Sequence, residues 1–243
     1  MLSGLHHVTC VCSDAQRTVE FYRDGLAFSL VKKTVNFDDP HSYHLYFGDA
    51  VGAPGTLLTF FEWPRAEPGR LGRGTLESIG VHTPAVTEEC EGEDPDGLRL
   101  RLYPAETPGI VDVTAIGNAA LYAGVVDAHA PISFAEPAEE TALIGPGTTH
   151  HVAWRTADDA EQQVWLQRLA EVGLRPTPVQ DRTYFRSIYF RMPDGILLEI
   201  ATDGPGFLVD EPADHLGERL ALPPWLETER ATLERELAPI TWG

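Results

Sequence analysis

The stretch Gly147-Thr148-Thr149-His150-His151-Val152-Ala153-Trp154-Arg155 decides how this chain is organised, because its His-His-Val core also occurs at His6-His7-Val8. Both copies stand in runs of apolar and β-branched residues, which favour buried strands. The segment opened by the second pair ends in another strand-like run, Gly195-Ile196-Leu197-Leu198-Glu199-Ile200. Two histidine pairs in matching contexts indicate a duplicated module.

The segments around the two pairs have the same order of predicted elements. The first has a strand over 5–12, a helix over 13–24, and strands over 29–35, 43–47 and 56–63. The second has a strand over 149–155, a helix over 156–173, and strands near 177–180, over 186–192 and over 196–202. Both helices begin at Ser, Thr or Asp and end at Gly, the residues that cap helix ends. The sequence predicts an α+β fold with complete βαβββ modules over 1–64 and 147–203.

The remaining segments are less regular. Residues 65–146 contain strand-like runs at 76–82, 98–103, 110–114 and 121–128 and a loop-like stretch at 131–146. This region is too short for two full modules, so we expect shortened middle modules that form an auxiliary lobe. The tail, 204–243, is expected to place a charged helix, from 227 to about 237, over the core.

Composition excludes several classes of function. Lys plus Arg total 18 and Asp plus Glu total 37, a formal net charge of −19, which repels nucleic acid and anionic lipid. No apolar run approaches the roughly 20 residues that cross a bilayer, and no basic-then-apolar leader opens the chain. The three cysteines, Cys10, Cys12 and Cys90, form no disulfide framework. We therefore expect a cytoplasmic protein with no nucleic acid or membrane partner.

Overlaying the two modules points to a metal site. Gly55-Thr56-Leu57-Leu58-Thr59 parallels Gly195 to Glu199, so Thr59 takes the position of Glu199, and Ser42-Tyr43-His44 parallels Ser187-Ile188-Tyr189. A histidine from each pair with one carboxylate is the ligand set of a facial triad, which leaves coordination positions open. Within each pair one histidine should face away from its partner, and alternation does not decide which one.

Two further side chains are predicted beside the carboxylate. Pro193-Asp194-Gly195 suits a three-residue hairpin loop, which places Tyr189 across from Glu199, with Cβ atoms about 5 Å apart. The Tyr189 hydroxyl could then donate or accept a proton, or its ring could simply pack. Arg182, just before this strand, could hold a substrate oxygen or pair with a surface carboxylate.

These runs carry a family resemblance. The runs are Leu5 to Thr9, Tyr43 to Asp49 with Pro54-Gly55-Thr56, Gly147 to Ala153, Tyr184 to Asp203, and Leu222-Pro223-Pro224-Trp225. Together they resemble the ring-cleaving dioxygenases of the vicinal oxygen chelate superfamily, in particular the hydroquinone dioxygenase branch. Members of that branch usually have four well-formed modules in a longer chain. The shortened middle of this chain departs from that pattern, in a region that bears on substrate specificity and on the oligomer interface, and a homo-oligomer is compatible with it.

The resemblance implies a cup built by paired modules. It implies Fe(II) held by His7, His151 and Glu199, and Mn(II) suits the same ligands. It also implies supporting roles in catalysis for four neighbours, which are His6, His150, Arg182 and Tyr189. The implied substrates are a small aromatic diol and O2, and the implied activity is extradiol-type ring cleavage.

Two other functions fit parts of the pattern. A glyoxalase-like isomerase or lyase would share the fold, but a fourth, glutamate-type ligand is expected there and Thr59 stands in its place. A metal-free drug-binding protein of the same fold would have no use for Glu199 and two histidine pairs. Metal content of the purified protein separates these classes.

Overall fold

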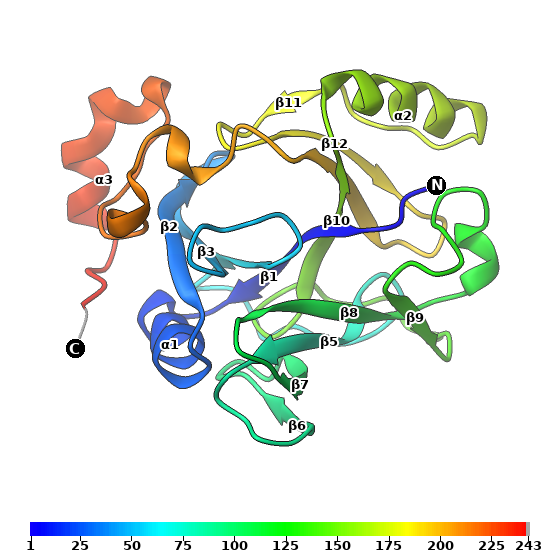
Figure 1. Ribbon diagram of the computed structural model, residues 1–243, viewed down its shortest axis with the longest axis horizontal. Coiled ribbons are helices and arrows are strands. Elements are labelled where there is room, and N and C mark those ends of the chain that lie inside the picture. Colours follow the sequence, from blue (N-terminus) through cyan, green and yellow to red (C-terminus); the bar gives the residue numbers. More distant parts are fainter. Residues whose placement is uncertain (242–243) are drawn as a thin grey trace.

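The two end modules build one sheet. In the computed structural model, which describes residues 1–241, the first module contains β1 (Leu5–Cys12), α1 (Ala15–Val19), a π-helical turn (Glu20–Gly25), β2 (Ser29–Asn36), β3 (Asp39–Gly48) and β4 (Leu57–Glu62). The last contains β10 (Thr149–Thr156), α2 (Asp159–Glu171), β11 (Gln180–Asp181), β12 (Arg186–Arg191) and β13 (Leu197–Thr202). Together their strands form an eight-stranded sheet in the order β11-β12-β13-β10-β1-β4-β3-β2 (Figure 1). The predicted α+β fold with complete end modules is confirmed.

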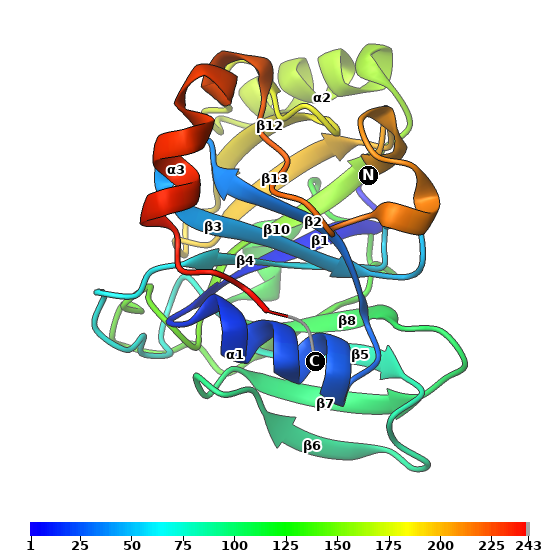
Figure 2. The same ribbon diagram turned by 90° about the vertical axis from the view of Figure 1, so that its left-hand side faces the viewer.

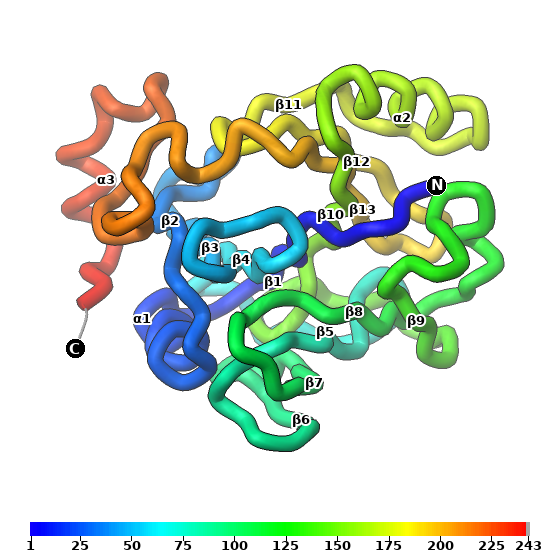
Figure 3. The backbone as a smooth tube through the Cα atoms, in the orientation of Figure 1, coloured from blue at the N-terminus to red at the C-terminus, as the bar shows by residue number. Residues whose placement is uncertain are grey.

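The two modules meet at their first strands. β1 and β10 pair antiparallel at the centre of the sheet, and each pairs in parallel with the last strand of its own module, β4 or β13. The backbone trace shows the N-terminal strand running through the middle of the molecule (Figure 3). The strands that carry the histidine pairs are therefore neighbours, although 144 residues separate the second histidines of the two pairs.

The middle of the chain repeats this topology in reduced form. Its strands are β5 (Leu76–Thr83), β6 (Cys90–Glu93), β7 (Arg99–Pro104), β8 (Gly109–Ile116) and β9 (Ile132–Ala135). They form a second sheet in the order β6-β7-β5-β8-β9, with β5 antiparallel to β8 at the centre and parallel neighbours β7 and β9 outside them. This is the pattern of β3-β4-β1-β10-β13, without a helix equivalent to α1 or α2 in the described residues. The predicted shortened middle modules are confirmed.

The two faces of the eight-stranded sheet have different surroundings. Val8, Cys10, Leu58 and Phe60 are fully buried in a core cluster that also contains residues of α1 and of the second sheet. Figure 2 shows α1 below the eight-stranded sheet, in front of the second sheet, and the ring of Tyr22, just after it, lies 4.6 Å from that of Phe60. The structural core thus lies on the outer face, which leaves the inner face for a cavity.

The tail covers one edge of the cup. It contains short helical turns at Phe207–Val209, Ala213–His215 and Pro224–Glu229, followed by α3 (Arg230–Glu236). The charged helix predicted from 227 to about 237 is present, although its α-helical part begins only at Arg230, and Leu233 and Leu237 anchor it in the core. Residues 242–243 of the predicted tail segment lie outside the described residues. No helix of the described part of the chain is long and apolar enough to span a membrane.

Several local predictions were wrong. The strand expected at 121–128 is a 3-10 turn, Ala119–Tyr122, and a loop, because Tyr122, Val125 and Val126 are buried as loop anchors. β6 was missed because it is an exposed, acidic edge strand without apolar alternation. The loop expected at 131–146 contains β9, and the strand expected at 177–180 is only the two-residue β11.

Candidate metal centre

Each histidine pair lies at an irregularity of its strand. Between β1 and β10 the register passes from Leu5↔Trp154 to His7↔Ala153, which leaves His6 as an extra residue on β1. It then passes from Thr9↔His151 to Cys10↔Thr149, which leaves His150 as an extra residue on β10. A bulge re-aims the side chain of its extra residue. The expectation that one histidine of each pair faces away from its partner was therefore wrong: the rings lie side by side.

The second histidine of each pair meets Glu199. His7 Nε2 lies 3.3 Å from His151 Nε2 and 3.3 Å from Glu199 Oε2, and His151 Nε2 lies 2.9 Å from Glu199 Oε2. All three side chains are at least 95 % buried. Two ligand atoms about 2.1 Å from one ion and at right angles to each other are about 3.0 Å apart. The three atoms therefore have the spacing of three adjacent ligands of one divalent ion, and the structure brings together three side chains that could hold it.

The first histidine of each pair orients the second. His6 Nδ1 lies 2.9 Å from His7 Nδ1, and His150 Nδ1 lies 2.8 Å from His151 Nδ1. Burial, with a contribution from the neighbouring histidine, lowers the pKa of both His6 and His150 to about 3, so these rings are neutral and can accept a hydrogen bond. A proton on Nδ1 of His7 and of His151 satisfies both contacts. That tautomer leaves the two Nε2 lone pairs directed at the cluster.

Glu199 is held in the ionised form that a metal ligand requires. Burial alone would raise its pKa, but His7 and His151 together hold the pKa well below its usual range. Ser187 donates a short hydrogen bond to Oε1, while Oε2, which faces the two histidines, has no hydrogen-bond partner of acceptable geometry. The buried Glu199 Oε2 and the Nε2 lone pairs of His7 and His151 face one another with no proton to share. Such a group of acceptors fits a bound cation.

The first module supplies no second carboxylate. Thr59 pairs with Thr9, two residues after His7, just as Glu199 pairs with Ala153, two residues after His151. The predicted equivalence of Thr59 and Glu199 is thus confirmed. The Thr59 hydroxyl is engaged by Thr9 Oγ1 at 2.8 Å and by His44 Nε2 at 3.0 Å. An ion held by His7, His151 and Glu199 alone would keep further coordination positions for small molecules.

The predicted equivalence of His44 and Tyr189 is wrong by two residues. Tyr46 pairs with Thr59 as Tyr189 pairs with Glu199, so Tyr46 is the counterpart of Tyr189 and His44 that of Ser187. A slip of two residues along a strand keeps the same face, so the alternation pattern cannot detect it. His44 and Ser187 were missed as site residues. For Ser187 a signal existed, since it lies two residues before Tyr189 on the same face.

Tyr189 and Arg182 adjoin the triad. The register places Tyr189 opposite Glu199, as predicted, and Gly195 has φ = 102° in the turn that sets this register. Arg182 Nε donates to the Tyr189 hydroxyl at 3.1 Å, and its Nη1 lies 3.3 Å from Asp38 Oδ2, so the alternative in which Arg182 pairs with a surface carboxylate is confirmed. Burial raises the pKa of Tyr189, which keeps the phenol neutral.

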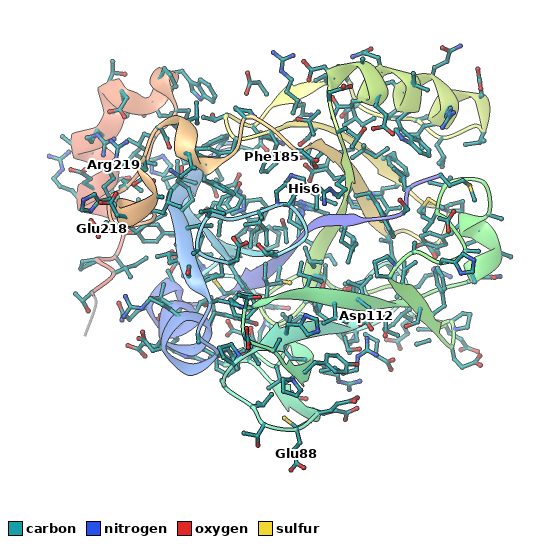
Figure 4. The ribbon with its side chains drawn as sticks, viewed as in Figure 1. His6, Glu88, Asp112, Phe185, Glu218 and Arg219 are labelled. Carbon is teal, nitrogen blue, oxygen red and sulfur yellow. The ribbon has the colours of Figure 1, made fainter. Side chains whose placement is uncertain are left out.

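A cavity of about 350 Å³ opens beside the three atoms. Phe37, Phe61 and Phe185 supply aromatic walls, while Arg182, Tyr189 and His44 supply polar groups. Figure 4 shows His6 and Phe185 together within the ring of strands, where their rings are 4.9 Å apart, whereas Asp112 and Glu88 lie on the second sheet and its edge. The size and lining suit a single substituted aromatic ring.

Comparison with known proteins agrees with this architecture. The profile of the glyoxalase/bleomycin resistance protein/dioxygenase superfamily matches residues 4–200. The chain belongs to this superfamily. Glyoxalase I of Zea mays shares its fold at 14 % sequence identity, with a TM-score of 0.59 over 82 % of this chain and 92 % of that one.

Other members of the superfamily are much more similar. MhqO of Bacillus subtilis (strain 168), provisionally named a ring-cleaving dioxygenase, is 34 % identical over 97 % of this chain and 96 % of its own length. A chlorohydroquinone/hydroquinone 1,2-dioxygenase of Sphingobium indicum is 28 % identical over 97 % of this chain and 96 % of its own length. A crystal structure of a provisionally named dioxygenase from B. subtilis has a TM-score of 0.91 at 31 % identity, over 99 % of this chain and 98 % of that one.

Proposed function

We propose that this protein is an Fe(II)-dependent, extradiol-type dioxygenase that cleaves the ring of a hydroquinone-type aromatic diol. The observation that carries the proposal is the convergence of His7, His151 and Glu199, with 2.9–3.3 Å between their ligand atoms, at the wall of an aromatic cavity. The names of the relatives, ring-cleaving and hydroquinone dioxygenases, support the same reaction class.

Each part of the site has a role in this proposal. Bound iron would supply coordination of a substrate oxygen and of O2 and the transfer of electrons between them. His6 and His150 hold the ligand imidazoles in one orientation through their Nδ1 contacts, and Ser187 does the same for Glu199. Phe61 and Phe185 exclude water from the faces of the substrate ring.

Tyr189 and Arg182 would manage protons and charge. The neutral Tyr189 hydroxyl, beside Glu199, can donate a proton to a substrate oxygen or accept a hydrogen bond from a substrate hydroxyl. The Arg182 guanidinium, 3.1 Å from that hydroxyl, stabilises negative charge that develops on the oxygen atoms nearby. Both groups lie on the β12 side of the cavity.

The test is oxygen uptake by the anaerobically iron-loaded protein with catechols, hydroquinones and gentisate. We expect hydroquinones to start oxygen consumption. The same assay with the Mn(II)-loaded protein shows whether the reaction requires iron. Isomerisation of a thiohemiacetal without oxygen, with no uptake for any diol, would assign the site to glyoxalase-like chemistry instead.

A further inference from the structure

His44 is a polar residue of the cavity that the metal site leaves unexplained. It lies on β3, whereas Tyr189 lies on β12, and four strands of the sheet, β13, β10, β1 and β4, separate these two. Both side chains line the same cavity. The imidazole therefore approaches a ligand from a different wall than Tyr189 and Arg182 do.

The position of the ring is fixed from three sides. Its Nε2 lies 3.0 Å from Thr59 Oγ1, which is itself 2.8 Å from Thr9 Oγ1. The rings of Tyr46 and Phe61 lie on its flanks, with centroids 4.1 and 4.3 Å away. A polar group held this firmly loses little conformational freedom when it binds a ligand.

One nitrogen of the ring remains available. Within residues 1–241, Nδ1 of His44 has no hydrogen-bond partner, although the ring is partly exposed to the cavity. Burial lowers the pKa of His44 well below its usual range, so the ring is neutral. In either neutral tautomer Nδ1 is a hydrogen-bonding group, as a donor or as an acceptor.

The duplication of the modules shows that His44 has a different hydrogen-bond partner from its counterpart. Its counterpart Ser187 hydrogen-bonds Glu199 and so supports a metal ligand. In the first module the carboxylate position holds Thr59, so His44 contacts a hydroxyl where Ser187 contacts a carboxylate. The exchange of a serine for an imidazole at this position brings a hydrogen-bonding nitrogen to the cavity wall.

We propose that His44 Nδ1 binds the substrate oxygen that is remote from the metal, and so selects rings with a second, distant hydroxyl. This inference rests on the proposed function. The two oxygens of a 1,4-diol lie at opposite ends of the ring, so only one of them can lie at the triad and the other needs a polar partner elsewhere. Arg182 and Tyr189 are already paired with each other beside Glu199, whereas His44 offers a fixed and unpaired nitrogen.

The experiment measures binding rather than turnover. Dissociation constants for hydroquinone and for phenol, which lacks the second oxygen, are determined by calorimetry with anaerobic, iron-loaded wild type, His44→Phe and His44→Asn. Phenylalanine keeps the ring between Tyr46 and Phe61 but has no nitrogen. Asparagine places an amide group near the position of Nδ1.

We expect His44→Phe to bind hydroquinone about 10-fold more weakly, the effect of one hydrogen bond, and phenol within about twofold of wild type. His44→Asn should recover most of the hydroquinone affinity. Equal affinities of wild type and His44→Phe for hydroquinone would overturn the inference while the proposed function stands. A parallel loss for both ligands would also overturn it, because it would show a packing role alone.

Iron content is measured in every sample. Loss of iron from His44→Phe would contradict the inference, since it would place His44 in support of the triad. If wild type binds no dihydroxylated ring at all, the proposed function fails and this inference fails with it. That result differs from equal hydroquinone affinities of wild type and His44→Phe, and from a parallel loss for both ligands, because in those two cases wild type still binds hydroquinone.

Discussion

At the scale of single residues, the centre depends on which nitrogen of each imidazole is free. His6 and His150 occupy Nδ1 of His7 and His151, so Nε2 of these two rings is left to the cluster with Glu199. A ligand and its supporting neighbour should therefore differ in how much metal affinity they control. Removing a neighbour lowers metal affinity by about 10- to 100-fold in sites of this kind, whereas removing one of three ligands destroys the facial arrangement.

We expect His7→Ala, His151→Ala and Glu199→Ala each to lose iron on gel filtration and to lose activity, while their circular dichroism spectra stay like that of wild type. His6→Ala and His150→Ala should retain iron at saturating concentration and bind it more weakly. His82→Ala, an exposed histidine on β5, is the matched control. A His6 or His150 variant that cannot be loaded, beside a ligand variant that can, would reverse the assignment within that pair.

Tyr189 gives a second residue-scale prediction. If its hydroxyl moves a proton during the reaction, Tyr189→Phe should lower turnover by roughly 100-fold or more with iron still bound, the scale of a positioned acid or base. Turnover and iron content are measured on the same sample. Full activity in Tyr189→Phe would leave the tyrosine a packing role beside Glu199.

At the scale of elements, the sequence predicted most strands that carry the site but not the two bulges, at His6 and His150, that direct its histidine side chains. The Pro193-Asp194-Gly195 turn was enough to place Tyr189 opposite Glu199, because a tight turn sets the register of a hairpin. The bulges at His6 and His150 were not predictable, since strand periodicity assumes unbroken pairing. The connection from β3 to β4 is longer and does not set the register of these two strands from the sequence. His44 was therefore aligned with Tyr189, two residues away from its true counterpart Ser187.

The tail is held to the cup by a buried ion cluster that no sequence pattern indicated. The side chain of Lys32 on β2 is fully buried, and its Nζ lies 2.6 Å from Asp210 Oδ1 and closer still to Glu211. Tyr184 donates to the other Asp210 oxygen at 3.0 Å, and the next residue, Phe185, packs on His7. The tail is thus connected to the wall of the metal site.

Lys32→Met should lower the free energy of unfolding by about 3–5 kcal/mol, because it leaves the buried carboxylate of Glu211 without its nearest cation. Urea denaturation measures the change. Lys33→Met removes the neighbouring ammonium, which donates to the Glu218 carbonyl, and should cost about 1 kcal/mol. Equal effects of the two substitutions would show that the cluster is not what fixes the tail.

At the scale of the whole molecule, the second sheet docks on the first module through the loop between β6 and β7. Ser13 donates to Asp96 through its hydroxyl at 2.6 Å, and the Tyr22 hydroxyl donates to Asp94 at 3.2 Å. The reduced copy of the central topology was foreseen only as shortened modules, because its edge strands carry charged surface residues rather than an apolar pattern.

Asp94 should make this docking sensitive to pH. Burial raises its pKa from 3.8 to about 6, although the backbone N–H groups of Leu98 and Asp96 oppose the shift. The folded protein then holds this proton more tightly than the unfolded chain, so the stability contributed by Asp94 is complete below pH 4 and is lost as the pH rises through 6. Asp94→Asn should gain about 3 kcal/mol relative to wild type between pH 4 and pH 7. Urea unfolding at both pH values checks this, and a constant difference between the two proteins would contradict it.

We propose that the whole arrangement cleaves an aromatic ring with O2. The most direct measurement follows oxygen consumption by the iron-loaded protein with hydroquinone, together with the mass of the product formed under ¹⁸O2, and uses Glu199→Ala to correct for autoxidation. We expect one O2 to be consumed per hydroquinone and an open-chain product that contains both labelled atoms. A quinone without label, or no consumption beyond that of Glu199→Ala, would contradict it.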